Sequence, residues 1–231
     1  MSRFKPLRLR LTALSWVGGA FATFCLAFAG PAAAQASDSG AIVPLHIVAF
    51  GDSLSAGYGV GPGQSFPEQL QAALIAKGYR VTVANAGVSG DTTTGGLARL
   101  DWSVPDSADL VIVELGANDA LRGVSPAITE KNLDTILQRL KQREIPVLLA
   151  GMIAPPNMGP DYAAAFNPIY AQLAQRYQAA FYPFFLDGVA GIPELNQADG
   201  MHPNPKGVAI VVAKILPAVT AQLDTIAASK D

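Results

Sequence analysis

The chain has 231 residues, of which 50% are hydrophobic and 15% are charged, and its formal net charge is −2. A chain of this size can form a single domain that buries a full hydrophobic core. The sequence holds no cluster of basic residues, so nucleic acids and anionic membrane surfaces are poor candidates for partners.

Residues 1–36 have the pattern of a secretory signal peptide. Four basic residues come before an apolar run at residues 11–29, and Ala34-Gln35-Ala36 forms a small-residue cleavage site. The alternative is a transmembrane anchor, since the run is about long enough to span a bilayer. Its small residues and the cleavage site favour the signal peptide. We therefore expect a secreted, periplasmic protein without a stable membrane anchor after cleavage.

Cleavage after Ala36 would leave residues 37–231 as one domain, which we expect to be a monomer. Cys25, the only cysteine, would be lost, so the mature chain could hold no disulfide, thiolate nucleophile or sulfur-ligated metal. Its charged side chains would be 12 basic and 18 acidic.

Apolar, β-branched segments alternate with segments of helical period along residues 37–231. The predicted strands span residues 45–50, 80–84, 110–115, 147–151 and 181–186. The predicted helices span residues 66–77, 92–101, 128–142, 162–179 and 206–227. Continuous apolar strands separated by helices indicate an α/β fold, in which a parallel sheet is covered on both faces.

A candidate nucleophile, Ser53, directly follows the first predicted strand, in the sequence Gly51-Asp52-Ser53-Leu54. Gly51 permits a sharp turn, and Ser53 lies where a strand ends and a helix can begin. Backbone N–H groups at such a place can face an anion. The same pattern is also a common helix N-cap, so this motif alone does not decide the function.

Three further polar motifs follow the second, third and fifth predicted strands. They are residues 85–91, residues 116–119 and residues 199–203. In an open parallel sheet, the carboxyl ends of the strands share one edge, and ligands bind there. Two long loops, 152–161 and 187–203, would shape a binding site at this edge.

His202 is the only sensible base for Ser53, because the one other histidine, His46, lies inside the first predicted strand. Asp199 precedes His202 by three residues, which lets its carboxylate orient the imidazole. Asn118 and the backbone of Gly90 can supply oxyanion donors. Each motif could instead be an ordinary turn or helix cap.

Other chemistries lack their motifs. The nucleophile elbow Gly-x-Ser-x-Gly does not occur, and the glycines at positions 57, 59, 61 and 63 lack the Lys-Ser/Thr pair of a phosphate-binding loop. No second histidine lies at metal-ligand spacing from the first. The sequence therefore predicts no metal and no cofactor.

The motifs resemble, in order, the four blocks of the SGNH (GDSL) hydrolases. The blocks are Gly51-Asp52-Ser53-Leu54, Gly90, Gly116-x-Asn118-Asp119 and Asp199-x-x-His202. Residues 85–92, 114–123 and 155–159 resemble the periplasmic thioesterase I, arylesterase and lysophospholipase branch of that family.

This resemblance implies a three-layer α/β/α, flavodoxin-like fold with a five-stranded parallel sheet. It implies Ser53 as nucleophile, His202 as base and Asp199 as its orienting partner. The backbone N–H groups of Ser53 and Gly90 and the amide of Asn118 would form the oxyanion hole. The implied partners are small-molecule acyl esters and thioesters, cleaved through an acyl-serine intermediate.

Residues near these blocks are predicted to contact the substrate, namely Asp52, Leu54, Asp119, Leu121, Pro156, Met158 and Tyr162. The loops 152–161 and 187–198 are expected to set the acyl chain length. Two alternatives stay open: a carbohydrate O-acetylesterase, and a non-catalytic ligand-binding module on the same scaffold. An apolar groove would favour lipid esters, and a shallow polar cleft would favour sugars.

Overall fold

The computed structural model describes residues 44–229, so the predicted signal peptide lies outside the described residues. One sheet of five parallel strands has the order β2-β1-β3-β4-β5. The strands are β1 (Leu45–Gly51), β2 (Val81–Gly87), β3 (Leu110–Glu114), β4 (Val147–Ala150) and β5 (Ala180–Tyr182). The predicted α/β fold with five parallel strands is confirmed.

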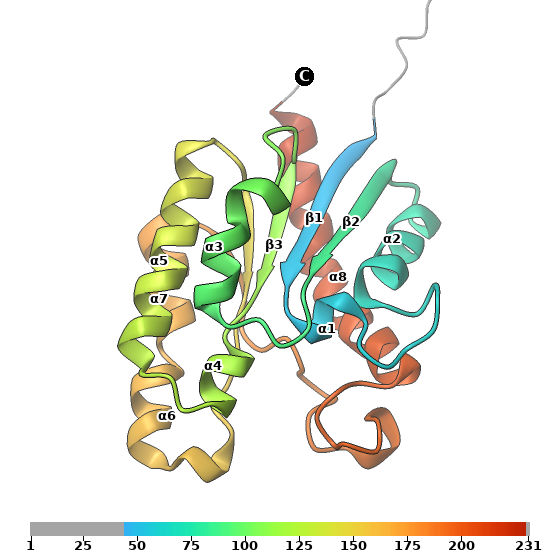
Figure 1. Cartoon of the computed structure of the whole chain (residues 1–231). Coiled ribbons are helices and arrows are strands. Elements are labelled where there is room, and N and C mark those ends of the chain that lie inside the picture. The colour runs from blue at the N-terminus through green and yellow to red at the C-terminus, as the bar shows by residue number, and fades with distance from the viewer. Residues whose placement is uncertain (1–43, 230–231) are drawn as a thin grey trace, which may run out of the picture. The chain divides into compact units, whose positions relative to one another are not determined.

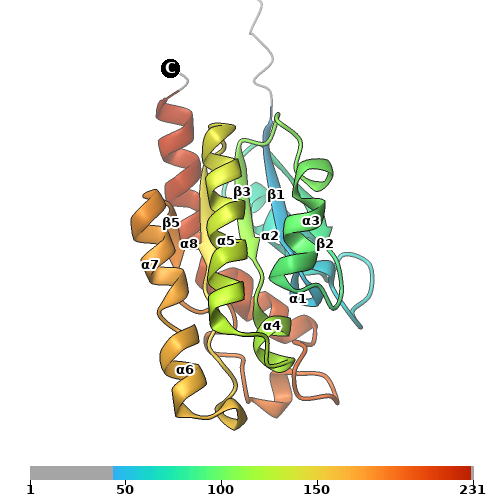
Figure 2. The same cartoon turned by 60° about the vertical axis from the view of Figure 1, so that its left-hand side comes forward.

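Helices cover both faces of this sheet (Figures 1 and 2). One layer holds α2 (Phe66–Ala76) and α8 (Pro205–Ala228), which pack on each other. The other layer holds α3 (Thr93–Ser103), α5 (Pro126–Gln142) and α7 (Ile169–Tyr177). Because helices cover both faces of the central strands, residues 47–50 of β1 and all of β3 are inaccessible to solvent, which explains the apolar runs there.

Local sequence signals set where the two helices of the first layer begin. Ser65 and Glu68 form a capping box at the start of α2, and Pro67 occupies the first turn, where its missing N–H costs nothing. At the start of α8, the side chain of Asn204 accepts hydrogen bonds from the backbone of Lys206 and Gly207.

Two prolines account for the main differences from the predicted elements. The helix predicted at 162–179 is two helices, α6 (Pro160–Phe166) and α7, because Pro168 has no N–H to continue the hydrogen-bond ladder. The last strand, predicted at 181–186, ends at Tyr182, directly before Pro183.

The second strand is longer than predicted. It runs to Gly87, three residues beyond its predicted end, and pairs there with Gly51.

Within the described residues, α8 is the one helix that is long and apolar enough to cross a membrane. Its apolar side chains recur at helical spacing and are buried, among them Val208, Val212, Ile215, Val219 and Leu223. These side chains pack on α2, β4 and β5. We therefore interpret α8 as a core helix of the domain.

Short elements gather past the carboxyl ends of the strands (Figure 1). They are α1 (Ser53–Ala56), α4 (Ala117–Leu121), α6, and the 3₁₀ turns η1 (Pro156–Met158) and η2 (Pro193–Leu195). At three to seven residues, these elements are too short to give a helical period in the sequence. Two of them, α1 and α4, carry the motifs that contain Ser53 and Asn118.

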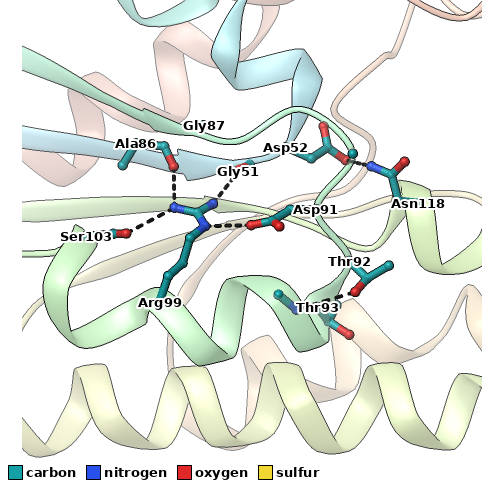
Figure 3. A network of polar contacts seen from close by, with 12 residues as sticks. Gly51, Asp52, Ala86, Gly87, Asp91, Thr92, Thr93, Arg99, Ser103 and Asn118 are labelled. Carbon is teal, nitrogen blue, oxygen red and sulfur yellow. Dashed lines mark hydrogen bonds and ion pairs between the residues drawn. The ribbon is translucent and has the colours of Figure 1, made fainter.

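A buried arginine joins the ends of β1 and β2, as Figure 3 shows. The guanidinium of Arg99 donates to the carbonyl oxygens of Gly51 and Ala86, each at 2.8 Å. Its Nε lies 2.6 Å from a carboxylate oxygen of Asp91. The guanidinium also lies 4.4 Å from the centre of the Phe50 ring. This one side chain therefore fixes the two strand ends that lead to Ser53 and Gly90.

Candidate active site

Ser53 is the first residue of α1, directly after β1. Asp52 caps the helix, since one of its carboxylate oxygens accepts from the backbone N–H of Leu54 at 2.9 Å. Gly51 has no positive φ. A side chain there would overlap Ser55 and Glu114. A glycine is thus required at position 51 by the close packing beneath Ser53, and not by the sharp turn that the sequence suggested.

Ser53, His202 and Asp199 form a continuous chain of hydrogen bonds. The hydroxyl oxygen of Ser53 lies 2.9 Å from Nε2 of His202, although 149 residues separate the two. Nδ1 of the same ring lies 2.7 Å from a carboxylate oxygen of Asp199. This geometry is that of a nucleophile, a base within reach of it, and a carboxylate that orients the base.

The loop that carries Asp199 and His202 is closed on itself. Asn196 and Pro203 form an isolated antiparallel bridge, and the backbone N–H of Gln197 donates to the carbonyl of His202 at 2.8 Å. The second carboxylate oxygen of Asp199 accepts from the backbone N–H groups of His202 and Met201. These two backbone bonds, followed by the bond to the His202 ring, lower the pKa of Asp199 to about 2. Asp199 is therefore a carboxylate at neutral pH.

Asn118 faces the nucleophile turn from α4. Its amide Nδ2 donates to a carboxylate oxygen of Asp52 at 2.9 Å (Figure 3). A primary amide has two N–H donors, so this bond holds the amide and leaves the second N–H for a substrate oxygen. Gly90 lies on the loop after β2 with φ of 83°, and Arg122, at the end of α4, donates to its carbonyl at 2.8 Å. Arg122 thus ties the Gly90 loop to the helix that carries Asn118.

A pocket of about 530 Å³ opens beside these residues, and Ser53, Asn118 and His202 lie in its wall. The pocket is formed by segments that follow β1, β3, β4 and β5. Most of its lining is apolar, including Leu121, Met152, Ile153, Phe184, Leu186 and Met201. Leu121, Ile153 and Met201 are each 50% exposed. An apolar side chain half exposed at a pocket mouth is typical of a surface that binds apolar ligands.

The structure brings four of the seven predicted substrate contacts into the pocket wall, namely Asp52, Leu54, Leu121 and Pro156. The other three lie outside that wall. The Asp119 carboxylate is buried and accepts hydrogen bonds from Thr93 and Thr129, which joins α3, α4 and α5.

Tyr162 and Met158, which were predicted to contact the substrate, contact other residues of the protein. The hydroxyl of Tyr162 donates to the carbonyl of Val124 at 2.7 Å. The methyl group of Met158 lies next to Gly123. Asp119, Tyr162 and Met158 therefore contact other parts of the protein in this structure, and their predicted contact with the substrate stays a prediction.

A buried acid beneath the site was not predicted from the sequence as functional. Glu114 ends β3, and one of its carboxyl oxygens accepts from the hydroxyl of Ser55 at 2.8 Å and from the N–H of Asp52 at 3.3 Å. The other oxygen is buried without a hydrogen-bond partner. The sequence feature that could have indicated this buried acid is a glutamate at the end of an otherwise apolar strand.

Glu114 and Asp52 influence each other's ionisation. Burial, with the charge of Asp52 as a second cause, raises the pKa of Glu114 well above its ordinary value of 4.5. Burial also raises the pKa of Asp52, to about 6, although hydrogen bonds from Leu54 and Asn118 act in the opposite direction. Burial thus favours the protonated form of Glu114, while the hydrogen bonds to Asp52 favour its carboxylate.

Among residues 44–229, no group of three or more His, Cys, Asp or Glu side chains is arranged to hold a metal ion. The chemistry that the arrangement can perform is that of a serine nucleophile with a general base.

The chain is similar to known ester hydrolases in sequence and structure. Residues 49–210 match the model of the GDSL-like lipase/acylhydrolase family. The chain is 43% identical to esterase TesA of Pseudomonas aeruginosa over 68% of this chain and 79% of the relative. It is 41% identical to an arylesterase of Vibrio mimicus, over 79% and 86% of the two chains. The crystal structure of AlinE4, an SGNH-hydrolase family esterase, superimposes with a TM-score of 0.66 at 49% identity, over 78% of this chain and 97% of AlinE4.

Replacing Glu114 with glutamine should change how stability depends on pH. An acid whose pKa rises on folding destabilises the fold as pH rises above the unfolded pKa, because the unfolded chain can then release a proton that the folded chain keeps. The glutamine side chain of the variant would be neutral at every pH. The unfolding free energy of Glu114→Gln relative to the parent should therefore increase from about pH 5 upward, by at most about 1.4 kcal/mol per pH unit.

Thermal or urea unfolding of both proteins between about pH 4 and pH 8 measures this difference. Any constant cost of the new amide cancels, because only the slope against pH is compared. Glu194→Gln, at an exposed glutamate of η2, is the matched control and should run parallel to the parent. A Glu114→Gln curve that is also parallel would contradict a neutral Glu114.

Proposed function

Because the chain belongs to the GDSL-like lipase/acylhydrolase family and is an ester-hydrolysing serine enzyme, we propose that Ser53 forms the acyl intermediate and that the natural substrates are esters of apolar acyl chains. One observation carries the assignment of the residues. Nε2 of His202 lies 2.9 Å from the Ser53 hydroxyl oxygen, in the wall of an apolar pocket.

In the first half of the proposed reaction, the hydroxyl oxygen of Ser53 attacks the acyl carbonyl carbon, and Nε2 of His202 takes the hydroxyl proton. The carbonyl oxygen becomes an oxyanion, which the backbone N–H groups of Ser53 and Gly90 and the amide of Asn118 stabilise. Asp199 stabilises the imidazolium. The carbon–oxygen or carbon–sulfur bond then breaks, and the leaving alcohol or thiol takes the proton from His202.

In the second half, water replaces the leaving group. His202 accepts a proton from the water while the water oxygen attacks the acyl carbonyl of Ser53. The second tetrahedral intermediate collapses with cleavage of the bond to Ser53, whose oxygen regains a proton from His202. The carboxylic acid then leaves, and the enzyme returns to its starting state.

The lining of the pocket supports lipid or aryl esters over sugar esters. Its wall is mainly aliphatic, with the aromatic ring of Phe184, and its polar side chains are Asp52, Ser53, Asn118 and His202. Apolar surface of this kind gains free energy when it covers an acyl chain, whereas a carbohydrate would need polar partners for its hydroxyl groups. The carbohydrate O-acetylesterase alternative lacks such support. The esterase relatives likewise argue against a non-catalytic module.

We further propose that the chain is exported, loses residues 1–36, and acts as a monomer without a membrane anchor. The basic start, the apolar run and the Ala34-Gln35-Ala36 site support export. The apolar side chains of α8 are buried inside the domain, which supports the proposal that this helix is not a membrane anchor.

Replacing Ser53 with Ala should abolish ester hydrolysis, with a fall in kcat of at least about 10⁴-fold, because the nucleophile and its base act as one unit. Labelling by a fluorophosphonate should disappear together with turnover. Ser107→Ala removes an exposed serine after α3 and should keep both activity and labelling. Turnover retained in a folded Ser53→Ala protein would rule out Ser53 as nucleophile.

For p-nitrophenyl esters from acetate to palmitate, kcat/KM should rise with chain length, reach a maximum and fall once the chain exceeds the pocket. Each methylene that becomes buried contributes about 0.8 kcal/mol at most, which is about fourfold in kcat/KM. Ile153→Asn at the pocket mouth should reduce this slope.

Ile128→Asn is the matched control for the slope, because Ile128 is 48% exposed, close to the 50% of Ile153, but lies on α5 outside the pocket wall. Its slope should equal that of the parent. A parent rate that is highest on acetate and falls with every added carbon would contradict an acyl-chain pocket.

Expression of the full chain in a Gram-negative host should give a periplasmic protein that begins at Ser37 and elutes as a monomer. Amino-terminal sequencing and size-exclusion chromatography measure the two properties. Ala34→Lys should block cleavage, because the cleavage site requires a small residue there. A parent protein that stays in the membrane fraction with residues 1–36 attached would show an anchor instead.

A further inference from the structure

The aromatic ring of Tyr58 lies against the ring of His202. The two ring centres are 4.6 Å apart, and the planes are tilted by 41°. Tyr58 is 53% exposed, so burial of its own surface does not explain its place. Tyr58 is not one of the residues that line the apolar pocket. Its aromatic contact is with the ring of His202.

His202 needs support from outside its own loop. Residues 198–201, which precede it, are all exposed. The two hydrogen bonds of the ring, to Ser53 and Asp199, lie in the ring plane and do not stop the loop from moving along the normal to that plane. A neighbouring aromatic ring limits this movement.

Backbone contacts hold Tyr58 between the nucleophile and the base. Its N–H donates to the carbonyl of Ser53 at 3.1 Å. Its carbonyl accepts from the side-chain amide of Gln197 at 2.7 Å, and the same nitrogen donates to the carbonyl of Pro203 at 3.0 Å. Gln197 therefore joins the Tyr58 segment to the His202 loop across 139 residues of sequence.

The glycines beside Tyr58 allow this close approach. Gly57 and Gly59 have φ of 85° and 72°, which other residues rarely adopt. A side chain at Gly59 would also overlap the amide of Gln197. The segment after α1 is thus shaped to bring the Tyr58 ring and carbonyl to the His202 loop.

We propose that Tyr58 is a positioning residue for the general base: its ring holds the imidazole of His202 in line with Ser53, and Gln197 holds Tyr58 in turn. The inference rests on the proposed roles of Ser53 and His202. The face of a tyrosine ring carries negative potential, so it also favours the positive charge that His202 gains during acylation. Tyr58 acts through His202 and does not touch the acyl group.

The test compares Tyr58→Ala with Tyr58→Phe, using the p-nitrophenyl and ethyl esters of one acid. Tyr58→Ala keeps the backbone bonds and loses the ring, so kcat should fall about tenfold on both esters while KM stays within about twofold. Tyr58→Phe keeps the ring and should restore kcat. Trp102→Ala, which removes an exposed aromatic ring on α3 far from the site, is the matched control and should have parental kinetics.

Nuclear magnetic resonance supplies a second readout. The proton between Nδ1 of His202 and Asp199 should give a low-field signal, which Asp199→Asn identifies by removing it. In Tyr58→Ala this signal should broaden through faster exchange, and in Tyr58→Phe it should stay sharp. Thermal unfolding verifies that each variant is folded, and Tyr58→Leu replaces Tyr58→Ala if the latter does not fold.

Three results would overturn the inference: parental kcat in Tyr58→Ala, a Tyr58→Phe as slow as Tyr58→Ala, or a loss confined to the p-nitrophenyl ester. The last result would make Tyr58 a contact for aromatic leaving groups. Measuring Ser53→Ala in parallel distinguishes a failure of the Tyr58 proposal from a failure of the proposed role of Ser53. If Ser53→Ala is inactive while Tyr58→Ala is parental, only the role of Tyr58 fails; if Ser53→Ala is active, the proposed nucleophile itself fails.

Discussion

The buried guanidinium of Arg99 is the interaction on which the geometry of the site depends. It bonds the carbonyls of Gly51 and Ala86 at the ends of two neighbouring strands, and its charge is balanced by Asp91. A buried charge without a partner costs several kcal/mol, so this arrangement persists only as a complete set. Gly51 leads into the nucleophile and Asp91 directly follows Gly90. One side chain from α3 therefore sets the spacing between the nucleophile and an oxyanion donor before any substrate binds.

The two acidic side chains beneath Ser53, Asp52 and Glu114, have different roles. Asp52 must accept a hydrogen bond from Asn118, and a carboxylate accepts more strongly than a neutral acid. Glu114, which is wholly buried next to it, would oppose that charge if it were ionised. Burial favours the protonated form of Glu114, and in that form its side chain fills the space left by Gly51 and accepts from Ser55 without repelling Asp52. The same arrangement leaves Asp52 to orient the amide of Asn118.

The sequence predicted what depends on local pattern and left out what depends on distant contacts. The central strands are buried on both faces, so their sequences are apolar runs, and Ser53, Asp199 and His202 can be predicted because each follows a predicted strand. The break at Pro168 had a local signal that the predicted helix ignored. By contrast, Arg99 bonds to Gly51 across 48 residues of sequence. Its role follows from which strands are neighbours, and no spacing in the sequence states that order. For Asp119, the position in the motif predicted a contact with the substrate, whereas in the structure its hydrogen-bond partners are Thr93 and Thr129.

The two halves of the site differ in how they are held. Ser53 and Asn118 stand on short helices anchored to the ends of buried strands, whereas His202 and Asp199 stand on an exposed loop that is closed mainly by its own backbone. Exposed loops generally open at lower free energy than buried strands, so the distance from base to nucleophile depends on the contacts that hold this loop. The contacts of Tyr58 and Gln197 act at this junction. A general base must lie within about 2.6–3.2 Å of the proton it removes. The rate of acyl transfer therefore depends on contacts that lie outside both the acyl pocket and the hydrogen-bonded chain itself.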